Sequence, residues 1–384
     1  MKFSVKNLSL VFSAIVLLVF LKGDGHAISP ALSQPPKVLK EEYFIANVVE
    51  ILNVEEIEVA GYKTTTQTLG LTIENGHEKG KDVAVQFMAG AHGSKEAYEL
   101  GKKVIVQKIT ATKESVQYQI IDRYRMDFIG YIFILFLLIV VFIAGKKGIG
   151  SILGMFFSLF VLVGMIAPLI IAGYNPLLVS IGGALIIMVL SIYLAHGISK
   201  QTTSAIISTF IALVLSGLLS FLFVEISKLT GVGSEDSYSL QFGLSTIDLK
   251  GLLLGGIIIG TLGILDDITT SQAAIVFELH KANAELSYRS LVRKGLNVGR
   301  EHVAALVNTL FLVYAGVSLG LFVIFVLNPL KQPTWVLLNY QSVSEEIVRA
   351  LVGSIVLILA VPLSTVIAAI TVKRMTGNDK KSKK

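Results

Sequence analysis

The chain has 384 residues, of which 53% are hydrophobic and 16% charged, and its mean hydropathy is +0.72. This composition predicts a polytopic membrane protein, with the lipid bilayer as its first partner. The net charge of +6 does not indicate nucleic-acid binding, because Lys and Arg are spread along the chain and are not gathered into one patch studded with aromatic residues. The chain has no Cys, which excludes disulfides, thiolate metal sites and cysteine catalysis.

Residues 1–27 combine Lys2 and Lys6 before an apolar stretch from Leu8 to Leu21 with small residues at Gly25 and Ala27. This arrangement is typical of a secretory signal peptide, and an uncleaved signal anchor is the alternative. Residues 28–40 contain three prolines and are predicted to form an extended linker. In either case the positive-inside rule places the segment that follows outside the cytoplasm.

Residues 41–122 are predicted to form a small β domain. Alternating or β-branched runs recur, with turn residues such as Asn75-Gly76 between them. The expected strands are Tyr43–Leu52, Thr64–Ile73, Val83–Met88, Val104–Thr112 and Val116–Ile121. Five short strands favour a compact barrel of the OB or SH3 type. His77 and His92 have no third ligand at a telling spacing, so no metal site and no cofactor are expected.

Seven apolar stretches between residues 128 and 372 predict a bundle of seven membrane-spanning helices. These stretches are 128–145, 150–173, 177–196, 203–227, 249–279, 303–327 and 346–372. Most lysines and arginines of the connecting loops fall on one side of this bundle, together with the basic tail 373–384. The positive-inside rule then places the C-terminus in the cytoplasm and the β domain outside it.

Two adjacent carboxylates, Asp266 and Asp267, lie inside the fifth apolar stretch. An ionised Asp at the centre of a spanning helix costs roughly 2.5 to 3.5 kcal/mol on insertion scales. Such groups therefore usually face the interior of a bundle or a wet cavity. The alternative is a helix that ends at Leu265 and leaves both aspartates in water. A continuous helix is favoured, because no helix breaker occurs from Thr270 to Phe277.

A helical wheel divides the fifth stretch into two faces. Small and polar residues share one face with Asp267, namely Gly256, Gly260, Gly263, Thr270, Ser271, Ala274 and Glu278. Large apolar residues occupy the other face, namely Leu265, Ile268, Ile275, Val276 and Leu279. Gly256 and Gly260 form a pair of small residues four positions apart, which allows another helix to approach closely. The small face is therefore predicted to pack against protein and the large apolar face to meet lipid.

Residues Ala282 to Arg300 are predicted to form an amphipathic helix with Ser287 as its N-cap. Its apolar side carries Leu291, Val292 and Leu296, and its basic side carries Arg289, Arg293, Lys294 and Arg300. A helix with these two sides is expected to lie along the inner leaflet of the membrane.

The sixth stretch opens with His302 and carries Asn308 and Thr309, with Gly316 and Gly320 on the same broad face as His302 and Thr309. Packing this face against the small face of the fifth stretch would bring His302, Asn308 and Thr309 within reach of Asp266, Asp267 or Glu278. A histidine at the membrane interface is the alternative for His302.

Pro362 interrupts the seventh stretch beside Ser364 and Thr365. A proline kink frees a backbone carbonyl at membrane depth and in a transporter often lines or gates the path. An ordinary kink in a spanning helix is the equally weighted alternative.

The segments Leu252–Leu279, Gly299–Val303 and Val307–Gly316 resemble the YibE/F family of bacterial membrane proteins, through a Leu-Asp-Asp-x-Thr-x-x-Gln core, a Gly-Arg-x-His and an Asn-Thr-Leu. The resemblance marks Asp266, Asp267, Thr269, Gln272, Glu278, Gly299, Arg300, His302, Asn308 and Thr309. It implies the same membrane architecture and a bacterial plasma-membrane location, and it supplies no substrate or reaction.

Three classes of function are compatible with these features. The first is a secondary transporter or permease in which Asp266 and Asp267, with Thr270, Ser271 and Gln272 nearby, bind a proton, a cation or a small solute. The second is an envelope scaffold or assembly factor whose residues 41–122 bind an envelope protein. An intramembrane hydrolase ranks last, because an aspartyl dyad is expected from two facing helices, and so no enzyme is predicted.

Overall fold

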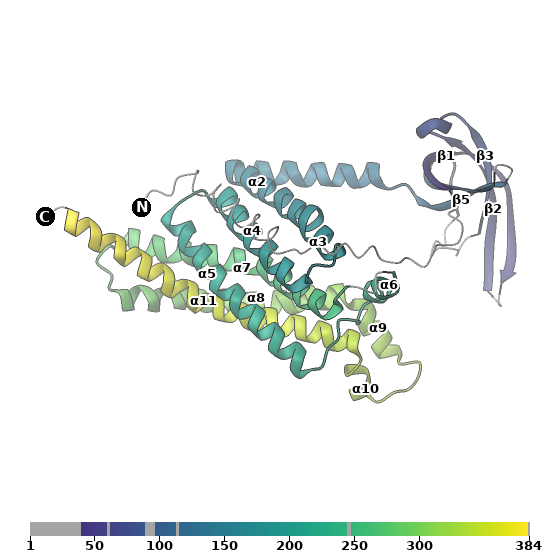
Figure 1. Cartoon of the computed structure of the whole chain (residues 1–384). Helices are drawn as coiled ribbons and strands as arrows, with labels where there is room; N and C mark the ends of the chain where they lie inside the picture. The colour runs from purple at the N-terminus through teal and green to yellow at the C-terminus, as the bar shows by residue number, and fades with distance from the viewer. Residues whose placement is uncertain (1–39, 60–61, 89–96, 113–114, 244–246, 383–384) are drawn as a thin grey trace. The chain divides into compact units, whose positions relative to one another are not determined.

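The computed structural model describes residues 40–59, 62–88, 97–112, 115–243 and 247–382 (Figure 1). The predicted signal peptide, all of the predicted linker except Lys40, and His92 lie outside the described residues. The chain divides into two compact units with a boundary between Ile139 and Val140, and each unit is described by itself.

The first unit contains a five-stranded antiparallel sheet in the order β3-β2-β1-β4-β5. Its strands are β1 (Lys40–Val59), β2 (Tyr62–Ile73), β3 (Asp82–Met88), β4 (Lys103–Thr112) and β5 (Ser115–Arg123), with a short 3₁₀ helix η1 (Gly76–Glu78) before β3. All five predicted strands are present. The edge strands β3 and β5 contact each other although they are last in the hydrogen-bonded order, so the sheet curls into a half-barrel.

Alternation of apolar and polar residues builds the core of this half-barrel. In β1, Phe44, Ala46 and Val48 are buried and the residues between them are not. The ladder between β1 and β4 ends at Asn47, and a register shift follows Val48. Beyond these points β1 pairs only with β2, so the two strands continue as a two-stranded arm.

The second unit is helical. Its elements, with the part of α2 that precedes Val140, are α2 (Met126–Val161), a π-helix η3 (Leu162–Ile166), α3 (Ala167–Ile171), α4 (Pro176–His196), α5 (Lys200–Ile226), α6 (Glu235–Gly243), α7 (Leu249–Ala282), α8 (Tyr288–Val317), α9 (Leu319–Leu327), α10 (Thr334–Leu338) and α11 (Gln341–Ser382). Side chains cap several of these helices: Asn175, Ser199, Asp248 and Ser287 accept hydrogen bonds from backbone N–H groups three residues later. The predicted N-cap at Ser287 is confirmed.

Five helices of the described residues are long and apolar enough to cross a membrane. They are Met126–Ile171, Pro176–His196, Lys200–Ile226, Leu249–Ala282 and Gln341–Met375. The pair α8 and α9 bends by 67° at Ser318 and gives a sixth candidate if both halves count as one span. The amphipathic segment does not form a helix separate from the sixth stretch, because α8 continues without a break from Tyr288 to Val317.

Helix α7 lies at the centre of the bundle and packs against α4, α5, α8 and α11. Its large apolar residues supply the contact surface, and Leu265, Ile268 and Val276 are all at most 2% exposed. Close approach to α4 depends on Gly255, where an added Cβ would lie 2.3 Å from the Ser180 Oγ. The fold thus places the two aspartates near the middle of the most enclosed helix.

Candidate functional site

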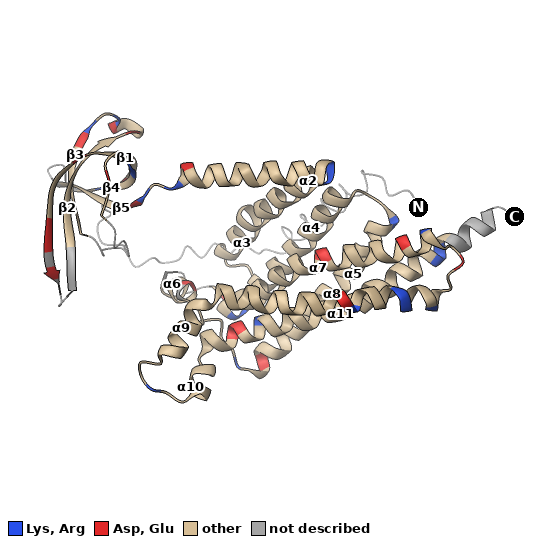
Figure 2. Ribbon diagram, turned by 180° about the vertical axis from the view of Figure 1, so that it is seen from behind, with Lys and Arg blue, Asp and Glu red and all other residues tan. Residues whose placement is uncertain are grey.

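Asp266 lines a pocket of about 500 Å³ between α7, α4 and the second half of α2. The Ser191 hydroxyl of α4 donates a hydrogen bond to the Asp266 Oδ2 at 3.1 Å. Ser151 and Ser158 of α2 also line the pocket. Gly154 lies between them and adds no side chain to the lining. The half-buried carboxylate therefore faces hydroxyl groups and small residues. Acidic positions are few along the helices of this unit (Figure 2).

The Asp267 side chain is exposed, and its carboxylate has no hydrogen bond or ion pair among the described residues. The charged side chains that act electrostatically on His196, at the end of α4, are Lys147 and Asp267. Thr270 does not reach either carboxylate, because its hydroxyl donates to the backbone carbonyls of Asp266 at 2.8 Å and Asp267 at 3.1 Å. Asp266 and Asp267 thus have different surroundings although they are neighbours.

The predicted orientation of α7 is wrong. Gly256, Gly260 and Gly263 are exposed, and an added Cβ at any of them would meet no atom within 4 Å. The large apolar face is buried instead, because bulky side chains fill the space between helices and bury more surface than glycines can. The prediction that these glycines pack against another helix of the chain is therefore wrong, although the wheel grouped the two faces correctly.

Gln272 joins three helices near the cytoplasmic end predicted for α7. Its Nε2 donates to the Gly295 carbonyl of α8 at 2.9 Å and to the Thr365 hydroxyl of α11 at 2.7 Å. The Gln272 side chain is 1% exposed, and its Oε1 has no hydrogen-bond partner in the part of the chain that the structure describes. Gln272 therefore connects α7 to α8 and α11 by hydrogen bonds and does not line the pocket that Asp266 lines.

Thr269 extends this buried polar cluster to α5. Its hydroxyl lies 2.5 Å from the Thr209 hydroxyl, and its backbone carbonyl accepts from the Ser364 hydroxyl of α11 at 3.0 Å. Thr209, Thr269 and Ser364 are all fully buried. The two motif residues that follow the aspartates thus hold helices together, which is a common role for polar groups at membrane depth.

Gly295 and Gly299 of α8 receive the Gln272 side chain. An added Cβ at Gly299 would lie 2.5 Å from the Val361 Cγ1 and 3.1 Å from each terminal atom of Gln272. The sequence analysis does not identify Gly295 as a packing residue, although Gly295-Leu-Asn-Val-Gly299 has the same small-xxx-small spacing as Gly256 and Gly260.

The small and polar face of α8 does not meet the aspartates. His302, Asn308, Thr309, Gly316 and Gly320 are all exposed, and the two glycines have no atom within 4 Å of an added Cβ. The Thr309 hydroxyl donates to the Ala305 carbonyl of its own helix at 3.0 Å. The predicted packing of the two small faces is therefore wrong, because α8 contacts α7 through its first turns, where Leu291, Gly295 and Gly299 are buried.

Glu278 and Ser271 also stay apart from the pocket that Asp266 lines. Glu278 is exposed and forms an ion pair with Lys281 at 3.4 Å, and Ser271 is half-buried. At Pro362, α11 continues as one helix, and the proline ring is exposed. The role of Pro362 as a gate stays a prediction.

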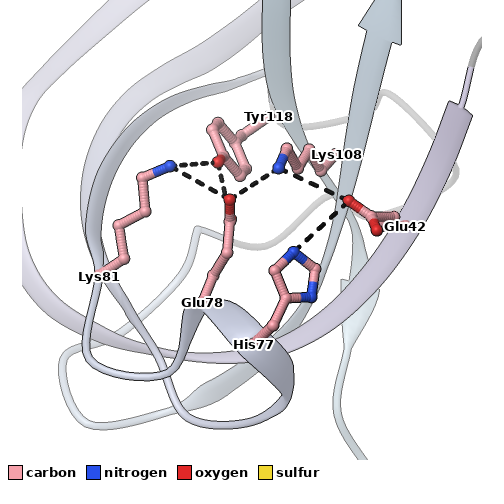
Figure 3. Close-up of polar contacts among 6 residues, drawn as sticks. All are labelled: Glu42, His77, Glu78, Lys81, Lys108 and Tyr118. Atoms are coloured by element: carbon pink, nitrogen blue, oxygen red, sulfur yellow. Dashed lines mark hydrogen bonds and ion pairs between the residues drawn. The ribbon is translucent and has the colours of Figure 1, made fainter.

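A second charged cluster lies in the β unit, around Glu78 (Figure 3). Lys108 and Tyr118 donate to its carboxylate at 2.7 Å and 2.8 Å, and Lys81 donates at 3.3 Å. Burial alone would raise the pKa of Glu78, but these hydrogen bonds outweigh it and lower the pKa to about 2.

His77 lies 3.8 Å from Glu42. Within the described residues no group of three His, Asp or Glu side chains has metal-binding geometry.

Comparison with known proteins identifies the helical region. A family model described as YibE/F-like protein matches residues 132–374. Neither the curated proteins nor the solved structures gave a match. The matched segment includes Asp266, Gln272 and both glycines that receive Gln272. Because the match covers more than half of the chain, this membrane protein belongs to the YibE/F-like family.

Proposed function

We propose that this chain is a secondary transporter or permease in which Asp266 binds a proton or a cation during transport. The supporting observation is the half-buried Asp266 carboxylate, which lies near the middle of α7, lines a pocket of about 500 Å³ and has one hydroxyl partner, Ser191. A carboxylate at membrane depth is costly unless it has a partner or is neutralised, so a proton or a cation stabilises it. Asp267 is exposed and supplies a second carboxyl group next to the site.

Proteoliposomes loaded with a pH-sensitive dye, or supplied with radioactive sodium, test this proposal on the full chain. The expected result is flux of protons or sodium that Asp266→Asn abolishes and that Glu278→Gln, an exposed acid on the same helix, preserves. Equal flux in the wild type and in Asp266→Asn contradicts the proposal. Asp266→Asn must insert and fold as the wild type does for the comparison to count.

The proposed topology has seven spans in a bacterial plasma membrane. Met126–Ile171 contains 46 residues, which is about 69 Å of helix and about twice the hydrocarbon thickness. Gly145 has non-helical angles (φ 57°, ψ −133°), and a division there yields two spans. With α8 and α9 as one bent span the total is seven, the β unit of OB or SH3 type is extracytoplasmic and the C-terminus is cytoplasmic.

Because the chain has no Cys, single cysteines report this topology without background. On intact cells a membrane-impermeant maleimide should label Glu99→Cys in the β unit, whose side chain is 73% exposed, and should not label Lys281→Cys. The reverse pattern would contradict the topology.

A second candidate function is an envelope scaffold, and the arm of β1 and β2 favours it. Val49, Leu52 and Val54 lie on this arm or at its base and are each more than half exposed. Exposed apolar side chains on a strand with an unpaired edge are typical of a surface that pairs with another protein. If scaffolding is the function, Leu52→Asn with Val54→Asn removes cross-links to an envelope protein, whereas Asp266→Asn does not. In neither candidate is the chain an enzyme.

A further inference from the structure

The first four turns of α8 carry three arginines without ion-pair partners among the described residues. Arg289, Arg293 and Arg300 are exposed, and no carboxylate among the described residues lies within ion-pair distance of them. Some other cations of this unit are paired, for example Lys281 with Glu278 at 3.4 Å and Arg349 with Glu346 at 3.2 Å. Three neighbouring guanidinium groups without an internal partner leave a concentrated positive charge for an external anion.

These arginines share a groove with apolar side chains. The groove has a volume of about 420 Å³. Its lining consists of Tyr288, Arg289, Val292, Arg293, Leu296, Asn297 and Arg300. Val292 and Leu296 are half-buried and lie between the charged positions. The lining therefore suits an amphiphile, in which a charged group adjoins apolar carbon.

The packing of α8 against its neighbours keeps the face with the three arginines at the surface of the bundle. Leu291, Gly295 and Gly299 occupy the opposite side of α8 and are buried, with Leu291 at 0% exposed in a cluster with Val276 of α7 and Val372 of α11. Because the Gln272 Nε2 also bonds to the Gly295 carbonyl, the helix cannot roll its arginines inward without breaking this contact.

The same helix connects the groove to membrane depth. From Arg300, α8 continues without a break through Val303 and Leu306, which pack on the apolar core, to Val317. The segment Tyr288–Arg300 is about 20 Å long, so the groove lies within a few turns of the hydrocarbon region. Figure 2 shows further blue positions at this end of the helical unit.

We infer that this groove binds the phosphate of an anionic phospholipid, with Arg289, Arg293 and Arg300 on the headgroup and Val292 and Leu296 against the glycerol and upper acyl carbons. A soluble anion gains nothing from the apolar lining, whereas a lipid uses both parts. Clusters of arginine beside a spanning helix attract anionic lipids for this reason. This inference does not depend on transport.

The test measures lipid binding to the full-length protein in neutral detergent by native mass spectrometry, with dioleoyl phosphatidylglycerol and dioleoyl phosphatidylcholine as probes. The wild type should prefer phosphatidylglycerol. Each basic residue near an anionic lipid surface contributes about fivefold to binding, so Arg289→Gln with Arg293→Gln and Arg300→Gln should lose on the order of a hundredfold.

A matched control removes three other positive charges, at Lys146, Lys147 and Lys200, all exposed. This control should retain the affinity of the wild type for phosphatidylglycerol. An equal loss in the control would overturn the inference in favour of general surface charge. Unchanged binding in the arginine variant would overturn it outright. Displacement of the lipid by the same concentration of inorganic phosphate would assign the groove to soluble anions instead. All three arginines are exposed, so unfolding curves of the variants should match the wild type.

Discussion

Glu78 in the β unit and Asp266 in the helical unit are both shielded carboxylates, and their surroundings differ. The Glu78 side chain is 12% exposed and receives hydrogen bonds from two lysines and a tyrosine. Asp266 receives one hydrogen bond, from a serine, and faces a pocket. A carboxylate whose lone pairs are filled by fixed cations stabilises a fold, whereas one with spare lone pairs beside an open space can exchange a proton or an ion.

The largest expected effect on stability is at Glu78. Glu78→Gln removes the charge that Lys108 and Lys81 surround, and should lower the free energy of unfolding of the β unit by about 2 to 3 kcal/mol. Amide hydrogen exchange of the β strands in the full-length protein measures the loss. Glu99→Gln is the matched control, because Glu99 is 73% exposed and lies 4.0 Å from Lys102. Equal protection in both variants would show that the Glu78 cluster is not structural.

The second largest effect on stability is expected at a glycine in close contact with a neighbouring helix, compared with a glycine that has no such contact. Gly299→Ala places a Cβ 2.5 Å from the Val361 Cγ1 and should cost about 1 to 3 kcal/mol through overpacking. Gly260→Ala meets no atom within 4 Å and should change stability by less than about 1 kcal/mol. Thermal unfolding in detergent measures both. A large loss in Gly260→Ala would mean that a second copy or another protein covers the exposed face of α7.

The pH dependence of the β unit follows from Glu78. Its folded pKa of about 2 lies below its ordinary value of 4.5, so the stabilisation is complete above pH 4.5 and is lost as the pH falls toward 2. Protection of the β strands against exchange should therefore decline between pH 4.5 and 2. In Glu78→Gln this decline should be reduced, and a decline of the same size would attribute it to other carboxylates.

The smallest effect on stability is expected at the proposed transport site. Asp266→Asn removes a poorly partnered charge and should change the free energy of unfolding by less than about 1 kcal/mol. Ser191→Ala, which removes the single hydrogen bond, should change it by even less. Thermal unfolding of both variants beside Glu278→Gln is the measurement. Failure of Asp266→Asn to fold would place Asp266 with Glu78 as a structural residue.

Local features could be predicted from the sequence. Alternation located the five strands, although Asn53 to Val59 continued β1 beyond the expected end, and Ser287 capped α8 as its side chain suggested. The wheel also separated the two faces of α7. It could not determine which face is buried, because in a bilayer a row of leucine and isoleucine suits lipid and protein equally well.

The contacts of the polar residues depend on tertiary packing. The pairing of Asp266 with Ser191 joins residues 75 positions apart, and that of Gln272 with Thr365 joins residues 93 apart. The spacing of apolar and polar residues along a helix carries no information about contacts between residues so far apart in the sequence. The contacting part of α8 was mispredicted for the same reason, since Gly295 and Gly299 in its first turns receive a neighbour, whereas Gly316 and Gly320 farther along the chain have no atom of the described residues within 4 Å of an added Cβ.

Gln272 and Asp266 are six residues apart on one unbroken helix, or about 9 Å along its axis. A rigid rod of this kind cannot tilt at one point and stay still at the other. If binding of a proton or a cation to the Asp266 carboxylate tilts α7, the Gln272 amide, which bonds to α8 and α11, moves with it. Binding at Asp266 and movement of the neighbouring helices would then be mechanically coupled.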